Sequence, residues 1–186
     1  MMNALIYTEN SQLIIRKPNG LEWDYENVDA PELGWEYDVL VYDDIEVCIE
    51  NYDHSKSWDE QEKRSLSPAE KERIEQYIEN SEPPTGVTLN NQYVRDLNET
   101  VKLNIKEFTE KYGFDDLTEV TFAGREGSNH PYRSNARRVM EYADAQYVIY
   151  DQVVNEIFAT REDHLKTLDE YVDQFPIPSL IPDHER

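Results

Sequence analysis

A long helical pattern in the C-terminal half constrains the fold more than any other feature of the sequence. From residue 134 to residue 160, apolar side chains return every three or four positions, which is the spacing of an α-helix with one buried side. Ala145, Val148, Ile149 and Val153 fill flanking positions, so this helix has little polar surface. We expect other helices of the chain, or a second subunit, to cover it. The stripe consists of Ala136, Val139, Met140, Ala143, Tyr147, Tyr150, Val154, Ile157 and Phe158.

Four other segments carry helix signals. Ser67-Pro68-Ala69-Glu70 is typical of a helix start, because the serine can cap the helix and the glutamate can reach back to the cap. This helix is expected to end before Pro83-Pro84, since the residue before a proline disfavours helical geometry. The remaining helices are predicted over 88–112, 115–123 and 163–174.

The first 55 residues predict a small antiparallel sheet. Short runs rich in Val, Ile, Tyr and Trp alternate with turn sequences such as Lys17-Pro18-Asn19-Gly20. In the run over 45–51, Ile45, Val47 and Ile49 share one face, and acidic residues and Cys48 share the other. We therefore expect the sheet to have one acidic, solvated face. The expected strands cover 4–8, 13–16, 23–25, 37–42 and 45–51.

These patterns place the chain in the α+β class and divide it into four parts. Residues 1–55 form an acidic, β-rich domain, and residues 56–66 form a linker. Residues 67–175 form a helical domain of three to five helices, arranged as a bundle or a helical hairpin. Prolines at 176, 178 and 182 predict an extended tail over 176–186.

The charge is strongly negative and unevenly distributed. The chain has 40 acidic and 18 basic residues, a net charge of −22, and residues 1–60 alone carry −12. Binding to a phosphate backbone needs Lys and Arg, so we expect no direct nucleic-acid binding. The acidic surface favours either solubility or a basic partner protein.

The sequence predicts no catalytic site, cofactor or metal, so we expect the protein not to be an enzyme. The single Cys48 excludes a disulfide framework and a cysteine-based metal site, and the four histidines lack the spacing of a metal-binding helix. There is no Gly-x-Ser-x-Gly elbow. The start of the chain lacks a signal-peptide pattern, and no stretch approaches the roughly 20 apolar residues of a membrane span.

Two clusters have side chains that could bind a cation or a phosphate, but neither has the residue spacing of a known binding loop. Asp43, Asp44 and Glu46 carry oxygen ligands for a hard cation, although their spacing is that of a hairpin turn and not of a calcium loop. The same holds for the acids of 24–29. Gly124–Ser128 lies near four arginines, but it lacks the preceding strand and the Lys-Ser/Thr pair of a phosphate loop.

The order of segments from residue 66 to about residue 181 resembles a known family. The segments are the capped acidic helix after Leu66, the Pro83-Pro84-Thr85-Gly86-Val87-Thr88 turn, the helix over 93–112 with Tyr112-Gly113-Phe114, and the long helix before Val172-Asp173-Gln174-Phe175-Pro176. This order is similar to that of small bacteriophage and prophage tail proteins, which include tail-fibre assembly chaperones and tail-associated proteins of unknown function. The relatives often carry tryptophans where this chain has Tyr142 and Tyr147.

The resemblance implies a structural or assembly role in a phage tail, baseplate or fibre, exerted through protein–protein contacts. The expected partners are other virion or tail proteins in an oligomeric assembly, with no membrane, in a virion or in the cytoplasm of a bacterial host. The alternative function is that of an acidic DNA mimic that inhibits a host nuclease or restriction system. The tyrosine stripe of Tyr142, Tyr147 and Tyr150 is expected either in the core or at a subunit interface. The residues expected at a protein interface, if there is one, are Tyr142, Tyr147, Tyr150, Val154, Phe158, Trp23 and Tyr37.

Overall fold

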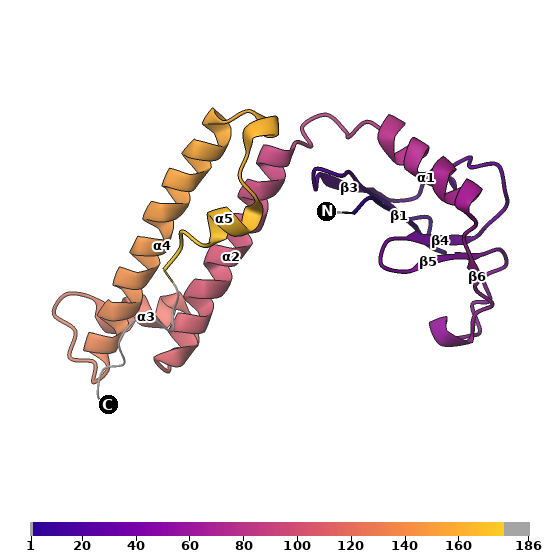
Figure 1. Ribbon diagram of the computed structural model, residues 1–186. Coiled ribbons are helices and arrows are strands. Elements are labelled where there is room, and N and C mark those ends of the chain that lie inside the picture. The colour runs from indigo at the N-terminus through magenta and orange to yellow at the C-terminus, as the bar shows by residue number, and fades with distance from the viewer. Residues whose placement is uncertain (1, 177–186) are drawn as a thin grey trace. The chain divides into compact units, whose positions relative to one another are not determined.

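A computed structural model describes residues 2–176 of the chain (Figure 1). The chain folds as two compact units, Met1–Leu89 and Asn90–Arg186. A six-stranded antiparallel sheet forms in the first unit and helices form the second, which confirms the predicted α+β class. We describe each unit by itself, as the sheet unit and the helical unit.

The sheet unit contains strands in the order β3-β2-β1-β4-β5-β6. Every adjacent pair is antiparallel, and tight turns join β1 to β2 and β2 to β3. Gly20 has a φ of +91° in the second of these turns, a conformation that glycine adopts without steric cost. The strands are β1 (Ala4–Tyr7), β2 (Leu13–Arg16), β3 (Glu22–Tyr25), β4 (Val39–Tyr42), β5 (Glu46–Ile49) and β6 (Arg64–Ser65).

Helix α1 (Pro68–Asn80) lies along one face of this sheet (Figure 1). It begins where the sequence predicts, since Ser67 Oγ accepts from the Glu70 amide and the Glu70 carboxylate accepts from the Ser67 amide. Its Ile74 and Ile78 are fully buried. The strand side chains of this core include Leu5, Tyr7, Leu13, Ile15, Trp23, Leu40 and Cys48.

The boundary between the units lies between Leu89 and Asn90, whereas the sequence indicated a linker over 56–66. The segment expected to be a linker contributes the 3-10 turn Trp58–Glu60 and strand β6. The two-residue β6 was not predicted, because so short a strand has no alternation to detect. Helix α1 belongs with the sheet because its apolar side covers the strands and its polar side binds them through ion pairs.

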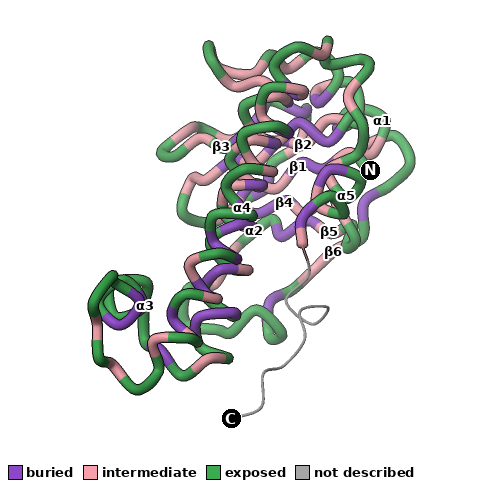
Figure 2. Tube along the Cα trace, turned by 90° about the vertical axis from the view of Figure 1, so that its left-hand side faces the viewer, coloured by how far each residue is buried: buried purple, intermediate pink, exposed green. Residues whose placement is uncertain are grey.

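The helical unit is built on two long helices, α2 (Leu89–Lys111) and α4 (Arg133–Ala159). Shorter helices α3 (Leu117–Gly124) and α5 (Leu168–Val172), with the 3-10 turn Glu162–His164, pack on this pair. Figure 2 shows buried and exposed residues alternating along the helices, as amphipathic patterns require. Phe108 of α2 stacks on Tyr142 of α4 with ring centroids 4.1 Å apart.

The predicted long helices agree with the structure to within a residue or two, but the last helix is shorter than expected. The sequence predicted one helix over 163–174, and the structure has a 3-10 turn followed by α5. Thr167 and Glu170 form a capping box that starts the helix only at Leu168. The expected tail over 176–186 lies outside the described residues except for Pro176.

Candidate protein-contact surface

An exposed apolar stripe runs along the C-terminal half of α4. Tyr147 and Phe158 are 43% and 57% exposed, and Val154 between them is half-buried. These residues are seven and four positions apart, so they share one side of the helix. We call Tyr147, Val154 and Phe158 the contact stripe. Large apolar side chains on one side of a helix favour burial against another polypeptide.

Helix α3 covers the same side of α4 two helical turns before Tyr147. Met140 lies seven residues before Tyr147, and it packs against Gly124 of α3. A Cβ added to Gly124 would lie 2.8 Å from Met140 Sδ and 3.3 Å from Ala136 Cβ, so glycine permits this close approach. The contact stripe thus continues a helix-packing surface beyond the point where α3 ends.

Tyr150 lies at the edge of the contact stripe, where it closes against α2. Its hydroxyl donates to the Val94 carbonyl at 3.5 Å, and its ring is half-buried. Burial raises the pKa of the Tyr150 phenol. Lys102 of α2 bonds Glu99 at 2.7 Å, which raises the pKa of Lys102. The polar edge of the stripe is therefore built by residues of α2.

Three residues predicted at an interface are instead in the cores of their own units. Trp23 and Tyr37 are buried in the sheet unit, where the Tyr37 hydroxyl donates to the Pro31 carbonyl at 2.7 Å. Burial strongly raises the pKa of Tyr37. Tyr142 is buried in the helical unit, and burial raises its pKa to about 12. The sequence showed that these aromatic side chains need cover, but their own chain supplies it.

Gln146 is a buried polar residue that sequence reasoning did not select. It is fully buried, and its Nε2 donates to the Pro176 carbonyl at 2.8 Å, which Tyr142 Oη also approaches at 3.0 Å. Asn104 donates to Gln146 Oε1 at 3.4 Å. Its position four residues after Tyr142 on the core side of the helix was the available signal. These bonds fasten the chain after α5 onto α4.

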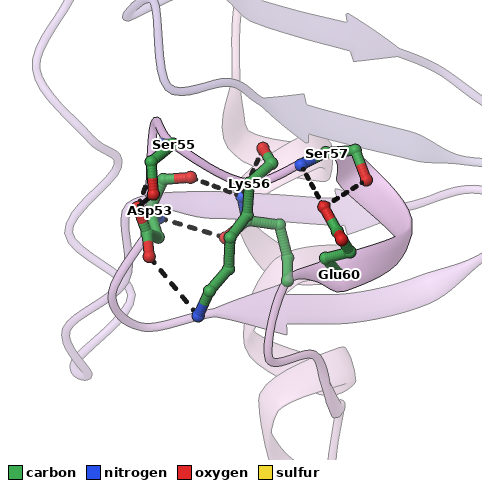
Figure 3. Close-up of polar contacts among 6 residues, drawn as sticks. Asp53, Ser55, Lys56, Ser57 and Glu60 are labelled. Atoms are coloured by element: carbon green, nitrogen blue, oxygen red, sulfur yellow. Dashed lines mark hydrogen bonds and ion pairs between the residues drawn. The ribbon is translucent and has the colours of Figure 1, made fainter.

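The segment before β6 lines a hollow with Asp53 and Glu62, and Asp53 and the nearby Glu60 are bound by their own segment (Figure 3). Asp53 accepts from the Ser55 amide and hydroxyl at 3.0 and 2.6 Å and lies 3.3 Å from Lys56 Nζ, and the Ser55 bonds lower the pKa of Asp53. Glu60 accepts from the Ser57 amide at 3.0 Å, which lowers its pKa. These bonds order the turn before β6.

The acidic residues Asp43 and Glu46, which the sequence assigns to a hairpin turn and not to a calcium loop, form ion pairs. Asp43 accepts from Arg16 at 3.3 Å, and Glu46 pairs with Lys71 of α1. No group of three or more His, Cys, Asp or Glu side chains within residues 2–176 is arranged to hold a metal ion. The hairpin acids therefore fasten neighbouring strands and helix α1.

The arginines near Gly124–Ser128 do not converge on an anion site. Arg125 lies over the Phe122 ring at 4.3 Å, and Arg138 donates to the Tyr112 hydroxyl at 3.3 Å. The shallow hollow beside Gly124 is lined by two arginines and three acids, and this balance does not favour an anion. The lining residues are Gly124, Arg125, Glu126, Arg137, Met140, Glu141 and Asp144.

Cys48 is a free, fully buried thiol at the centre of the sheet unit. Burial raises its pKa, which disfavours the reactive thiolate. Because the side chain packs between the sheet and its cover, Cys48 acts as a small core residue.

Comparison with known proteins gives no relative from which a function could be transferred. No family model matches the chain, no curated protein matches it, and no solved structure matches its fold. Among the described helices, none combines the length and apolar character needed to cross a lipid bilayer.

Proposed function

We propose that this chain is a structural or assembly protein of a bacteriophage virion, belonging to the tail, baseplate or fibre, and that it acts through protein–protein contacts. The contact stripe Tyr147–Val154–Phe158 is the observation that supports contact with another polypeptide. The resemblance in segment order over 66–181 supports the phage assignment. On this proposal the protein is not an enzyme and works in the virion or in the bacterial host cytoplasm as part of an oligomeric assembly.

The geometry of the contact stripe favours a helix as the covering element. Its side of α4 already accepts α3 at Met140, so a partner helix can continue the same packing toward Phe158. Aromatic side chains are enriched at the centres of protein interfaces because they bury a large area with few rotatable bonds. Tyr147 and Phe158 are therefore the expected anchors.

The origin of the gene gives the first test. A genome location among tail genes is expected, and a location outside any phage or prophage would overturn the phage part of the proposal. Particles purified from an infected culture should then contain the chain, or should fail to assemble when the gene is deleted.

Variants of the contact stripe test the surface itself. Tyr147→Ser and Phe158→Ser in the phage genome should each reduce the yield of infectious particles at least about tenfold, as expected for anchors in an interface. Val148→Ser is the matched control, since Val148 is 56% exposed but lies about 100° around the helix from Tyr147. If both stripe variants fold and give normal yields of infectious particles, the contact stripe is not a protein interface in the virion.

An acidic DNA mimic is distinguished by a direct assay. Such a protein would inhibit a nuclease or restriction enzyme at low salt and release it steeply as salt rises. Inhibition of this kind by the purified chain, together with its absence from particles, would replace the virion proposal.

A further inference from the structure

A row of branched aliphatic side chains crosses the sheet on the face opposite α1. Ile6 of β1 pairs in register with Ile14 of β2 and with Val41 of β4, and Val41 pairs with Val47 of β5. Residues paired across antiparallel strands point to the same face. We call these four residues the aliphatic row. All four are half-buried, and across four strands spaced about 4.8 Å apart the row is about 14 Å long.

The other face of the same strands shows that α1 covers only one side. Leu5, Ile15, Leu40 and Cys48 alternate with the aliphatic row along these strands and are at most 1% exposed. Tyr42 pairs with Leu5 in register and donates to Glu75 of α1, which places α1 on that face. Within the described part of the sheet unit, α1 is the only α-helix, so no helix of this unit covers the aliphatic row. On the row's own face, Ala4, Val39 and Ile49 are buried, so the accessible apolar surface is that of the row and not of the whole face.

Carboxylates border the aliphatic row. Asp24 pairs in register with Ile14 at one end of the row and is exposed. Along one side, Arg16 bonds Glu22 at 2.7 Å and Asp43 at 3.3 Å, so this bridge keeps one net negative charge.

The turn after β4 extends both the acidic border and the apolar surface. Asp44 is exposed there, and Ile45 beside it is 52% exposed. The border as a whole holds four carboxylates and one guanidinium: Glu22, Asp24, Asp43, Asp44 and Arg16. An apolar strip bounded by negative charge has the complementary chemistry of a basic segment that also carries apolar side chains.

We propose that the aliphatic row docks a basic polypeptide segment of a partner protein. The segment lays apolar side chains over Ile6, Ile14 and Val41, and its Lys or Arg side chains meet the acidic border. A second copy of this chain is disfavoured as the occupant, because residues 1–89 hold 21 acids and 7 bases, and pairing two such units would bring two charges of −14 together. This site is distinct from the contact stripe and does not depend on the virion proposal.

A designed peptide tests the chemistry directly. The probe is a 14-residue amphipathic helix of Leu and Lys, about 21 Å long, which is sufficient to span the aliphatic row. Two comparison peptides are needed: a Lys and Ser peptide of equal charge, and a Leu and Glu peptide of equal hydrophobicity. Binding to the full chain is followed through the methyl resonances of Ile and Val. The Leu and Lys peptide is expected to shift Ile6, Ile14, Val41 and Val47, and the other two should not.

Isosteric variants separate this surface from general attraction to an acidic protein. Val41→Thr and Ile14→Thr keep strand propensity and remove apolar contact, and each should weaken binding of the Leu and Lys peptide about tenfold. Asp24→Asn should weaken it less and reduce the dependence of Kd on salt. Val148→Thr, outside the contact stripe, is the matched control and should change Kd less than about twofold, since it alters an exposed valine of the other unit.

Four results would overturn the proposal. Equal binding of the Lys and Ser peptide would show that charge alone attracts the probe, and equal binding of the Leu and Glu peptide would remove the role of the acidic border. Methyl shifts confined to Val154 and its neighbours would assign the probe to the contact stripe. Circular dichroism would first confirm that Ile14→Thr and Asp24→Asn are folded. If both then bind the Leu and Lys peptide with an unchanged Kd, the aliphatic row is not the binding site. This conclusion holds even if Val41→Thr does not fold.

Discussion

Replacing Gln146 by Glu tests whether the buried amide holds the chain after α5 onto α4. Gln146 Nε2 donates to the Pro176 carbonyl at 2.8 Å in a fully buried position. A carboxylate there loses the donor and faces the carbonyl oxygen with its own negative charge. The side chain must therefore either take up a proton or leave the core, because an unpaired buried charge is far more costly than a neutral group.

The free-energy cost of Gln146→Glu depends on pH, because the buried acid has to stay protonated. An unperturbed Glu has a pKa of about 4.3, and each pH unit above it costs about 1.36 kcal/mol to keep the acid protonated. At pH 7 Gln146→Glu should therefore lower the free energy of unfolding of the helical unit by about 3–4 kcal/mol. Folding raises the pKa of this acid, so the penalty exists above the unfolded pKa and disappears as the pH falls through it. At pH 4.5 the loss should be below about 1 kcal/mol, since the protonated acid can donate to Pro176.

The chain provides its own internal control for this assay. All three tryptophans, at 23, 35 and 58, lie in the sheet unit, so tryptophan fluorescence reports that unit. Circular dichroism at 222 nm reports mainly the long helices of the helical unit. In urea titrations, Gln146→Glu should shift the dichroism transition at pH 7 and leave the fluorescence transition in place.

Gln146→Leu separates the hydrogen bonds from the charge. This variant removes the same donor without adding an ionisable group, so it should cost about 1–2 kcal/mol at both pH values. Wild-type stability of Gln146→Glu at pH 7, or an equal pH dependence in Gln146→Leu, would refute the assignment of Gln146 as a buried clamp.

Two further substitutions and one measurement of thiol reactivity test other parts of the structure. Gly124→Ala should destabilise the helical unit by about 1–3 kcal/mol in dichroism-monitored urea titrations despite the better helix propensity of Ala, because its Cβ would lie 2.8 Å from Met140 Sδ; a gain in stability would refute the close approach. Glu70→Gln should cost the sheet unit about 1 kcal/mol at pH 7 by tryptophan fluorescence. The hydrogen bond from Arg64 lowers the pKa of Glu70 from 4.5 to about 2, so this difference should persist above pH 4.5 and vanish as the pH falls toward 2; a constant difference would contradict the pairing. Cys48 should react with a thiol reagent at least about a hundredfold more slowly in the native chain than in urea, and rapid native reaction would show that the sheet core opens easily.

Helix positions could be predicted from the sequence because their signals are local. Ser67 and Glu70 specify the start of α1 through two bonds within four residues, and the three-to-four spacing of apolar residues marks α2 and α4 over many turns. The faces that these helices bury against each other are less local. Tyr142 and Tyr147 are both among the residues predicted at an interface, yet one is buried and the other is 43% exposed. Only the positions of α2 and α3 decide which of the two is covered.

The sheet illustrates the same limit more sharply. The sequence correctly predicts that Val47 and Ile49 share a face of β5, but the expectation of an acidic, solvated opposite face is wrong, since Cys48 on that face is fully buried. A strand pattern fixes which side chains share a face, while the helix that covers a face is chosen by the rest of the chain. Because α1 covers the side of Leu5, the side chains of Ile6, Ile14, Val41 and Val47 lie on the other side, where they are half-buried. The error in the sequence reading and the existence of the aliphatic row therefore have one cause, which is the choice of face by α1.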